Sequence, residues 1–121
     1  MQANTTIDID LSYLHLITEG DKQFEKMLLS GAVADIEAQV YKLQKAWKDQ
    51  NAAAVRNIAH SLKSITAIAG LPQLESACKM IDNLFADGIF HAEIEFVCAG
   101  IISRWELARP RLERLIGKYE S

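Results

Sequence analysis

One long apolar stripe constrains the fold of this chain more than any other feature. From residue 22 to about residue 48, apolar residues recur at three- and four-residue steps; they are Phe24, Met27, Leu28, Val33, Ile36, Val40, Leu43 and Trp47. This spacing predicts a single long amphipathic helix, whose apolar side must be buried against other elements. Gly31 lies within the helix and indicates either a close contact or a bend.

Capping residues divide the first half of the chain into three helices. Apolar residues with helical spacing begin near Leu11, and Gly20 ends that short element. Asp21 is a candidate N-cap for the long helix, because its side chain can accept a backbone hydrogen bond in the first turn. Asn51 can cap a further helix over residues 52–69 in the same way.

The second half of the chain predicts two more helices. Gly70 suits the left-handed turn that follows a helix, and Pro72 suits the first position of the next one. That helix is expected to stop around residues 87–88, and a last helix is expected to start near Ala92. Pro110 should kink or divide the last helix, because proline removes a backbone donor. The residues expected in the core here are Leu74, Cys78, Ile81, Leu84, Phe85, Ile94, Val97, Ile101, Trp105, Leu112, Leu115 and Ile116.

Four main helices joined by short connections predict an all-α fold. Short connections make neighbouring helices antiparallel, so we expect an up-and-down four-helix bundle with a short N-terminal helix across one end. The chain of 121 residues is long enough for one such domain. We assign residues 7–121 to the bundle and the polar residues 1–6 to a flexible tail.

Composition excludes several classes of function. The net charge of −3 is spread along the chain, so no basic face is available for nucleic acid. No uncharged apolar run could span a bilayer and no signal peptide is evident, so we expect a cytoplasmic protein. Cys78 and Cys98 lie among apolar residues without a CxxC pair, which favours buried, reduced thiols.

The helix over residues 52–69 carries a histidine on its polar side. On an ideal helix, which turns about 100° per residue, one side of this segment is apolar and consists of Val55, Ile58, Leu62, Ile65 and Ala69. The opposite side consists of Ala53, Arg56, Asn57, His60, Lys63, Ser64 and Ala67. His60 therefore lies in the middle of an exposed stripe of small or polar residues, where a partner protein could approach the imidazole.

The segment around His60 resembles a known family signature. Residues 60–70 read HSLKSITAIAG, which closely resembles the His-x-Leu-Lys-Gly/Ser pattern of histidine-containing phosphotransfer (HPt) domains, with a glycine ten residues after the histidine. Residues 9–14, followed by Gly20, Asp21 and Phe24, resemble the entry into the family's first two helices, and residues 78–82 resemble the helix beside its phosphorylated histidine. Ile65 departs from the small residue often found at its place, but it lies on the apolar side. The resemblance implies that His60 is a phosphoacceptor, with Nε2 as the attacking atom.

Neighbouring side chains have chemistry that fits this role. Lys63, nearly one turn after His60, can offer a positive charge to the phosphoryl oxygens, and Arg56 can do the same or meet an acidic partner residue. An acceptor at Nδ1 would fix the reactive tautomer. The resemblance places Asp82 where the family often has Gln or Glu; Asp is shorter, so its reach is open. Ser64 is small enough to admit a partner, and Asn57 and Ala67 complete the candidate partner-binding surface.

The resemblance implies a phosphorelay carrier in a two-component system. No Gly-rich GxxxxGK[ST] loop is present, so the chain should not phosphorylate itself from ATP. It is expected to bind no cofactor; Mg²⁺ and the phosphorylatable aspartate should be supplied by partner receiver domains, and a hybrid sensor kinase is a further candidate partner. A transient interface and a monomer are expected.

The sequence leaves two alternatives to consider, a metal site and a protein-binding adaptor, and only the adaptor is a serious one. His15, His60 and His91 come from separate elements without helical pairing, and the His91-x-Glu93 of zinc deaminases lacks its cysteine partner motif. We therefore expect no metal site. The serious alternative is a helical adaptor that binds a protein partner without phosphotransfer. The His-x-Leu-Lys set argues against it, because an adaptor needs no exposed nucleophile.

Overall fold

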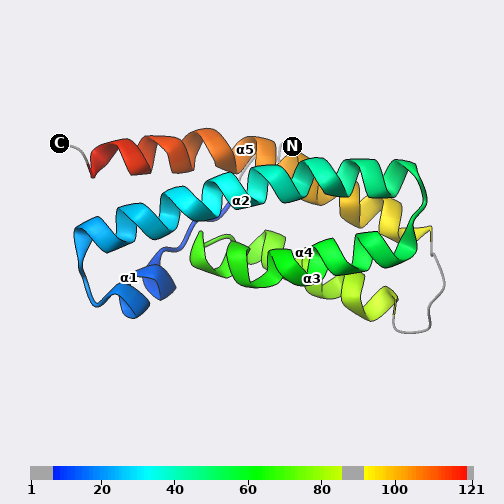
Figure 1. Ribbon diagram of the computed structural model, residues 1–121, viewed down its shortest axis with the longest axis horizontal. Coiled ribbons are helices and arrows are strands. Elements are labelled where there is room, and N and C mark those ends of the chain that lie inside the picture. The colour runs from blue at the N-terminus through cyan, green and yellow to red at the C-terminus, as the bar shows by residue number, and fades with distance from the viewer. Residues whose placement is uncertain (1–6, 86–91, 120–121) are drawn as a thin grey trace.

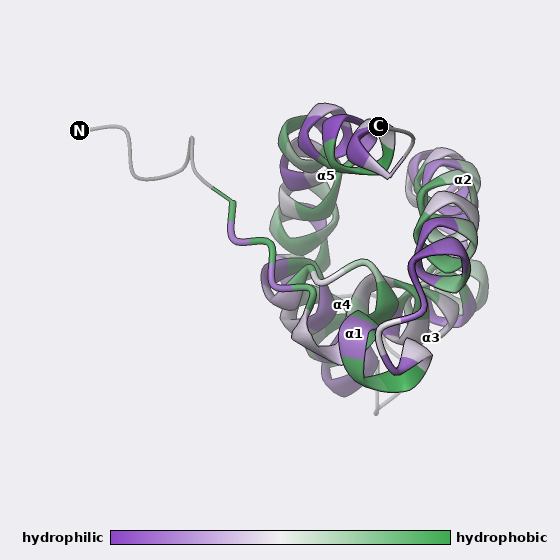
Figure 2. Ribbon diagram, turned by 90° about the vertical axis from the view of Figure 1, so that its left-hand side faces the viewer, coloured by the Kyte–Doolittle hydropathy of each residue, from purple (hydrophilic) through white to green (hydrophobic). Residues whose placement is uncertain are grey.

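The computed structural model of the chain describes residues 7–85 and 92–119, and all regular secondary structure in these ranges is helical. The five helices are α1 (Ser12–Thr18), α2 (Lys22–Lys48), α3 (Ala52–Ile68), α4 (Pro72–Leu84) and α5 (Glu93–Lys118). Helix α2 packs against α3, α3 against α4 and α4 against α5, and α5 also packs against α2. Figure 1 shows that the four run alternately in opposite directions, and Figure 2 shows α1 across one end. The predicted bundle is confirmed.

The predicted caps lie at the ends of the helices. The Asp21 side chain accepts a hydrogen bond from the Phe24 amide at 3.1 Å, and Asn51 accepts one from the Ala54 amide at 3.1 Å. Pro72 occupies the first turn of α4. The end of α4 at Leu84 precedes residues 87–88, which lie outside the described residues, as do the expected tail and His91.

Three expectations about helix interiors differ from the structure in whole or in part. Phe24 and Met27 are 39% and 62% exposed, because α2 turns Glu25 and Leu29 toward the core instead. Gly31 has open space around the position of a side chain, so it marks no close contact. Pro110 does not divide α5, which runs unbroken from Glu93 to Lys118.

The core itself consists mainly of aliphatic side chains from all five helices and the N-terminal segment, together with Phe85 and Trp105. On α3 the fully buried residues are Val55, Ala59, Leu62 and Thr66, while Ile58 and Ile65 are partly buried and pack against the core. Cys78 and Cys98 are free and buried, as expected. Burial raises the pKa of Cys78 to about 12 and that of Cys98 to about 11, so both thiols are poor nucleophiles at neutral pH.

A glycine turn sets α4 beside α3. Gly70 has φ +72°, and the amides of Gly70 and Leu71 donate to the carbonyls of Ala67 and Thr66 at 3.2 and 2.9 Å, which completes a Schellman motif. The Asp10 amide also donates to the Gly70 carbonyl at 2.8 Å. The turn therefore connects α3 to α4 and anchors the N-terminal segment as well.

Gly70→Ala should lower the free energy of unfolding by about 2 kcal/mol or more. A Cβ at this position would meet the Asp10 backbone carbonyl, and the positive φ disfavours any L side chain. Urea denaturation measures the change. Gly31→Ala is the matched control: because its site is open and helical, it should stabilise the protein by roughly 0.5–1 kcal/mol. Equal stability of the Gly70→Ala variant and wild type would contradict this account of the turn.

Candidate functional site

His60 lies in the middle of α3 with its side chain 71% exposed. Asp82 approaches it from the last turn of α4, and its Oδ2 is 3.5 Å from Nδ1 of His60. This separation is longer than a normal hydrogen bond, so the two groups are in electrostatic contact. The short Asp side chain therefore does reach the Nδ1 side of the ring, and its contact is with Nδ1 and not with Nε2.

Asp82 also binds both cations that flank His60 on α3. Lys63 Nζ donates to Oδ2 at 2.8 Å, and Arg56 Nε donates to Oδ1 at 3.3 Å. The hydrogen bond from Lys63, followed by the one from Arg56 and the contact with His60, lowers the pKa of Asp82 to about 2 against the effect of its burial. Asp82 is therefore ionised at neutral pH, and one carboxylate serves three groups of α3.

This arrangement adds a contact that the sequence did not predict. Lys63 and Arg56 were expected to face an incoming phosphoryl group or a partner, and in the structure both are paired with Asp82. Their proposed roles toward phosphate remain predictions. The charges of the two cations exceed that of the single carboxylate by one, so the surroundings of His60 favour an arriving dianion.

The rest of the predicted partner surface is open. Asn57 and Ser64 are exposed, and the Ser64 hydroxyl donates to the Ser61 carbonyl of its own helix at 3.4 Å. Ala67 lines a hollow that it shares with Tyr13 of α1, so the stripe on α3 continues onto α1. The sequence did not predict Tyr13 as part of this surface. It is recognised in the structure as a large side chain that is 49% exposed.

The described residues offer no metal centre: within 7–85 and 92–119, no group of three or more His, Cys, Asp or Glu side chains could hold an ion. His15 and His60 lie in different clusters: Nδ1 of His15 is 2.6 Å from Glu25 Oε2, whereas Nδ1 of His60 lies beside Asp82. In the same ranges, no helix is both long and apolar enough to cross a bilayer.

The chain matches the Hpt domain family over residues 27–115. This span covers well over half of the chain and includes His60, Lys63 and Asp82, so the chain belongs to the Hpt domain family. Hpt domains carry phosphoryl groups on histidine in phosphorelay signalling, interact with receiver domains and are not kinases. Searches of curated proteins and of solved structures returned no match.

Asp82→Ala should change the tautomer of His60. An ionised acceptor beside Nδ1 favours the neutral ring with its proton on Nδ1, and its removal should raise the fraction protonated on Nε2. Side-chain ¹⁵N NMR measures this fraction at a pH where the ring is neutral. Asp82→Asn, which keeps an acceptor oxygen, should give an intermediate fraction. If all three proteins have the same tautomer ratio, Asp82 does not orient His60.

Proposed function

We propose that this chain is a phosphorelay carrier whose His60 accepts a phosphoryl group from the aspartyl phosphate of one receiver domain and passes it to the aspartate of another. The observation that carries the proposal is the contact between Asp82 and Nδ1 of an exposed histidine, at 3.5 Å, on a stripe without large apolar side chains. The membership in the Hpt domain family supports the same chemistry.

The proposed transfer needs no proton to leave the site. The Nε2 lone pair attacks phosphorus, the N–P bond forms, and the O–P bond to the receiver aspartate breaks, so the aspartate leaves as a carboxylate. The imidazole keeps its Nδ1 proton and becomes cationic, and Asp82 lies where it can stabilise that charge. In the return transfer a receiver aspartate attacks phosphorus and the N–P bond breaks, so the ring, which keeps its Nδ1 proton, leaves as neutral imidazole.

Lys63 and Arg56 are proposed to stabilise the phosphoryl oxygens. Both side chains start from the face of α3 that carries His60, and both now share Asp82 as acceptor. An arriving phosphoryl group offers a second, stronger acceptor, and either cation can turn toward it while the other stays on Asp82. We propose that Mg²⁺ is held by the receiver and that transfer occurs in the cytoplasm.

Transfer between purified proteins tests the proposal. Wild-type protein is mixed with a panel of receivers carrying ³²P-labelled aspartyl phosphate and Mg²⁺, and acid-labile, base-stable label on the chain is followed with time. At least one receiver should label the chain within minutes, and addition of a second, unlabelled receiver should remove the label. A chain that binds receivers and takes no label from any of them would be an adaptor.

A further inference from the structure

A buried carboxylate lies at the end of the bundle where α1 crosses it. Glu25, in the first turn of α2, has a fully buried side chain. Burial of a charge is unfavourable unless the charge is paired and hydrogen-bonded. Sequence reasoning missed this residue, although it precedes the buried Leu29 by one helical turn and so shares its face.

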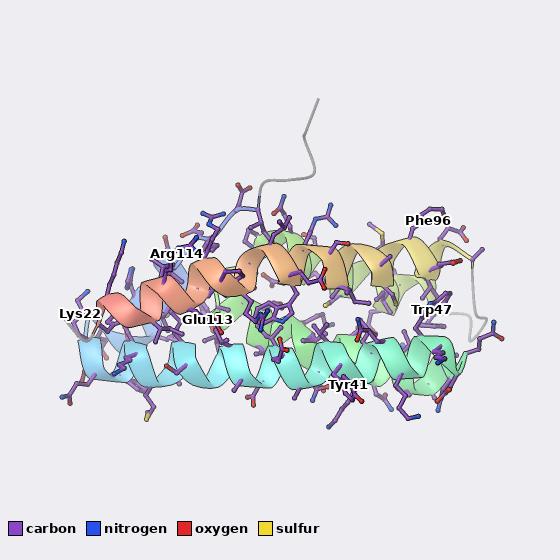
Figure 3. All side chains as sticks on the ribbon, turned by 90° about the horizontal axis from the view of Figure 1, so that it is seen from above. Lys22, Tyr41, Trp47, Phe96, Glu113 and Arg114 are labelled. Atoms are coloured by element: carbon purple, nitrogen blue, oxygen red, sulfur yellow. The ribbon has the colours of Figure 1, made fainter. Side chains whose placement is uncertain are left out.

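The two oxygens of Glu25 join two other parts of the chain. Oε2 lies 2.6 Å from Nδ1 of His15 and 3.0 Å from Oγ1 of Thr18, both on α1. Oε1 accepts a hydrogen bond from the Tyr119 hydroxyl at 3.0 Å, at the end of α5, and Lys22 Nζ lies 3.7 Å away. Figure 3 shows Lys22 beside the C-terminal part of α5. One carboxylate thus connects α1 and the end of α5 to α2.

The bonding fits an ionised carboxylate. The hydrogen bond with His15, with further ones from Thr18 and Tyr119, holds the pKa of Glu25 at about 2 despite its burial. Burial and the bond to Glu25 raise the pKa of Tyr119, so its hydroxyl keeps the proton that it donates. The Thr18 proton serves either Glu25 or the Leu14 carbonyl, 2.8 Å away. His15 and Tyr119 are therefore the main donors.

The hydrogen bond from Asp10 to Gly70 anchors the segment that precedes α1, but α1 itself has few contacts with the bundle besides those to Glu25. It has only seven residues, of which Leu14 and Thr18 are buried. A helix of this length is not stable by itself. Its apolar residues Tyr13, Leu16 and Ile17 are exposed by 49%, 72% and 37%. The hydrogen bonds to Glu25 therefore contribute a large share of what holds α1 in place.

The position of α1 matters for the surface around His60. Tyr13 of α1 and Ala67 of α3 line the same hollow, and Ala67 lies two turns beyond His60 on the exposed stripe. His15, Lys22, Glu25 and Tyr119 all fall outside the span matched to the family, so this connection is a feature of the chain beyond that match.

We propose that Glu25 is a positioning residue that holds α1 against the bundle, so that α1 completes the surface on which a receiver domain docks. This inference rests on the proposed function. Glu25 does not contact His60 and has no part in the transfer step. It acts through α1 on the docking of a large partner and leaves a small phosphodonor unaffected.

Glu25→Gln, His15→Ala and His15→Gln test this proposal with two donors. One donor is the receiver that labels wild type fastest, and the other is phosphoramidate, which needs no docking surface. With the receiver, Glu25→Gln and His15→Ala should lower kcat/KM about tenfold or more, mainly through KM. With phosphoramidate, both should stay within about twofold of wild type. His15→Gln, which restores a donor to Glu25, should recover most of the loss.

Amide hydrogen exchange reports the state of α1 in the same variants. Exchange over residues 12–18 should be at least about tenfold faster in Glu25→Gln and His15→Ala than in wild type. The control is Lys45→Gln, which breaks an exposed pair with Asp49 (3.6 Å) at the other end of α2 and should change neither readout. His15 is half exposed, so His15→Ala remains informative if Glu25→Gln does not fold.

The outcomes separate the two proposals. If wild type takes no label from any donor, the proposed function fails before the variants are compared. If wild type is labelled and the variants with fast exchange in α1 accept phosphate from the receiver equally fast, Glu25 does not position the docking surface. Equal losses with both donors would likewise overturn the inference, because they would place the damage at His60 itself.

Discussion

His60→Gln should abolish phosphorylation while the bundle stays intact. The side chain is 71% exposed, so its replacement opens no cavity, and Gln is a good helix former. Without the imidazole the chain has no nucleophile at the centre of the stripe. The initial rate of labelling should fall at least about 10³-fold, to background, with a phosphorylated receiver and with phosphoramidate alike.

Two controls test whether His60→Gln still folds and still binds a receiver. The circular dichroism spectrum and the urea midpoint of His60→Gln should match those of wild type, because no buried contact is lost. Binding of an unphosphorylated receiver, measured by calorimetry, should change little. Acid-labile label that persists on the variant would show that another residue accepts the phosphoryl group.

Ser64→Trp should block the receiver and spare the histidine. Ser64 lies one turn after His60, is exposed, and has its hydroxyl turned back to its own helix. A large ring there would stand where the partner must approach, so transfer from a receiver should slow at least about 100-fold. Labelling by phosphoramidate should stay within about twofold of wild type, because a small donor can pass the ring.

Ala99→Trp is the matched control for this steric block. Ala99 is exposed on α5, which packs against α2 and α4. The same large side chain there should leave both donors as fast as in wild type. If Ser64→Trp accepts phosphate from the receiver at the wild-type rate, the partner does not approach along the stripe that contains His60.

Local chemistry explains which features could be predicted from the sequence. Asp21, Asn51 and Gly70 mark helix ends through bonds to residues a few positions away, so their roles depend on nearby sequence only. The exposed stripe of α3 follows from the spacing of apolar residues within one helix. These features required no knowledge of how the helices pack.

Long-range contacts explain the errors and the omissions. The apolar stripe of α2 was assigned from apolar residues alone, which placed Phe24 and Met27 in the core and overlooked Glu25. Glu25 is buried because His15 and Tyr119 reach it from α1 and from the end of α5, the latter 94 residues away in the sequence. The reach of Asp82 likewise depends on the distance between α3 and α4, which spacing within one helix does not give.

The attachment of phosphorus to His60 is the most direct test of the account. The chain, labelled with ¹⁵N in its histidines, is incubated with a phosphorylated receiver and Mg²⁺ and followed by long-range ¹H–¹⁵N NMR. We predict that phosphorus is bound to Nε2 of His60 and that Nδ1, beside Asp82, carries the proton. Phosphorus on Nδ1 of His60, on another residue, or on no residue of the chain would contradict it.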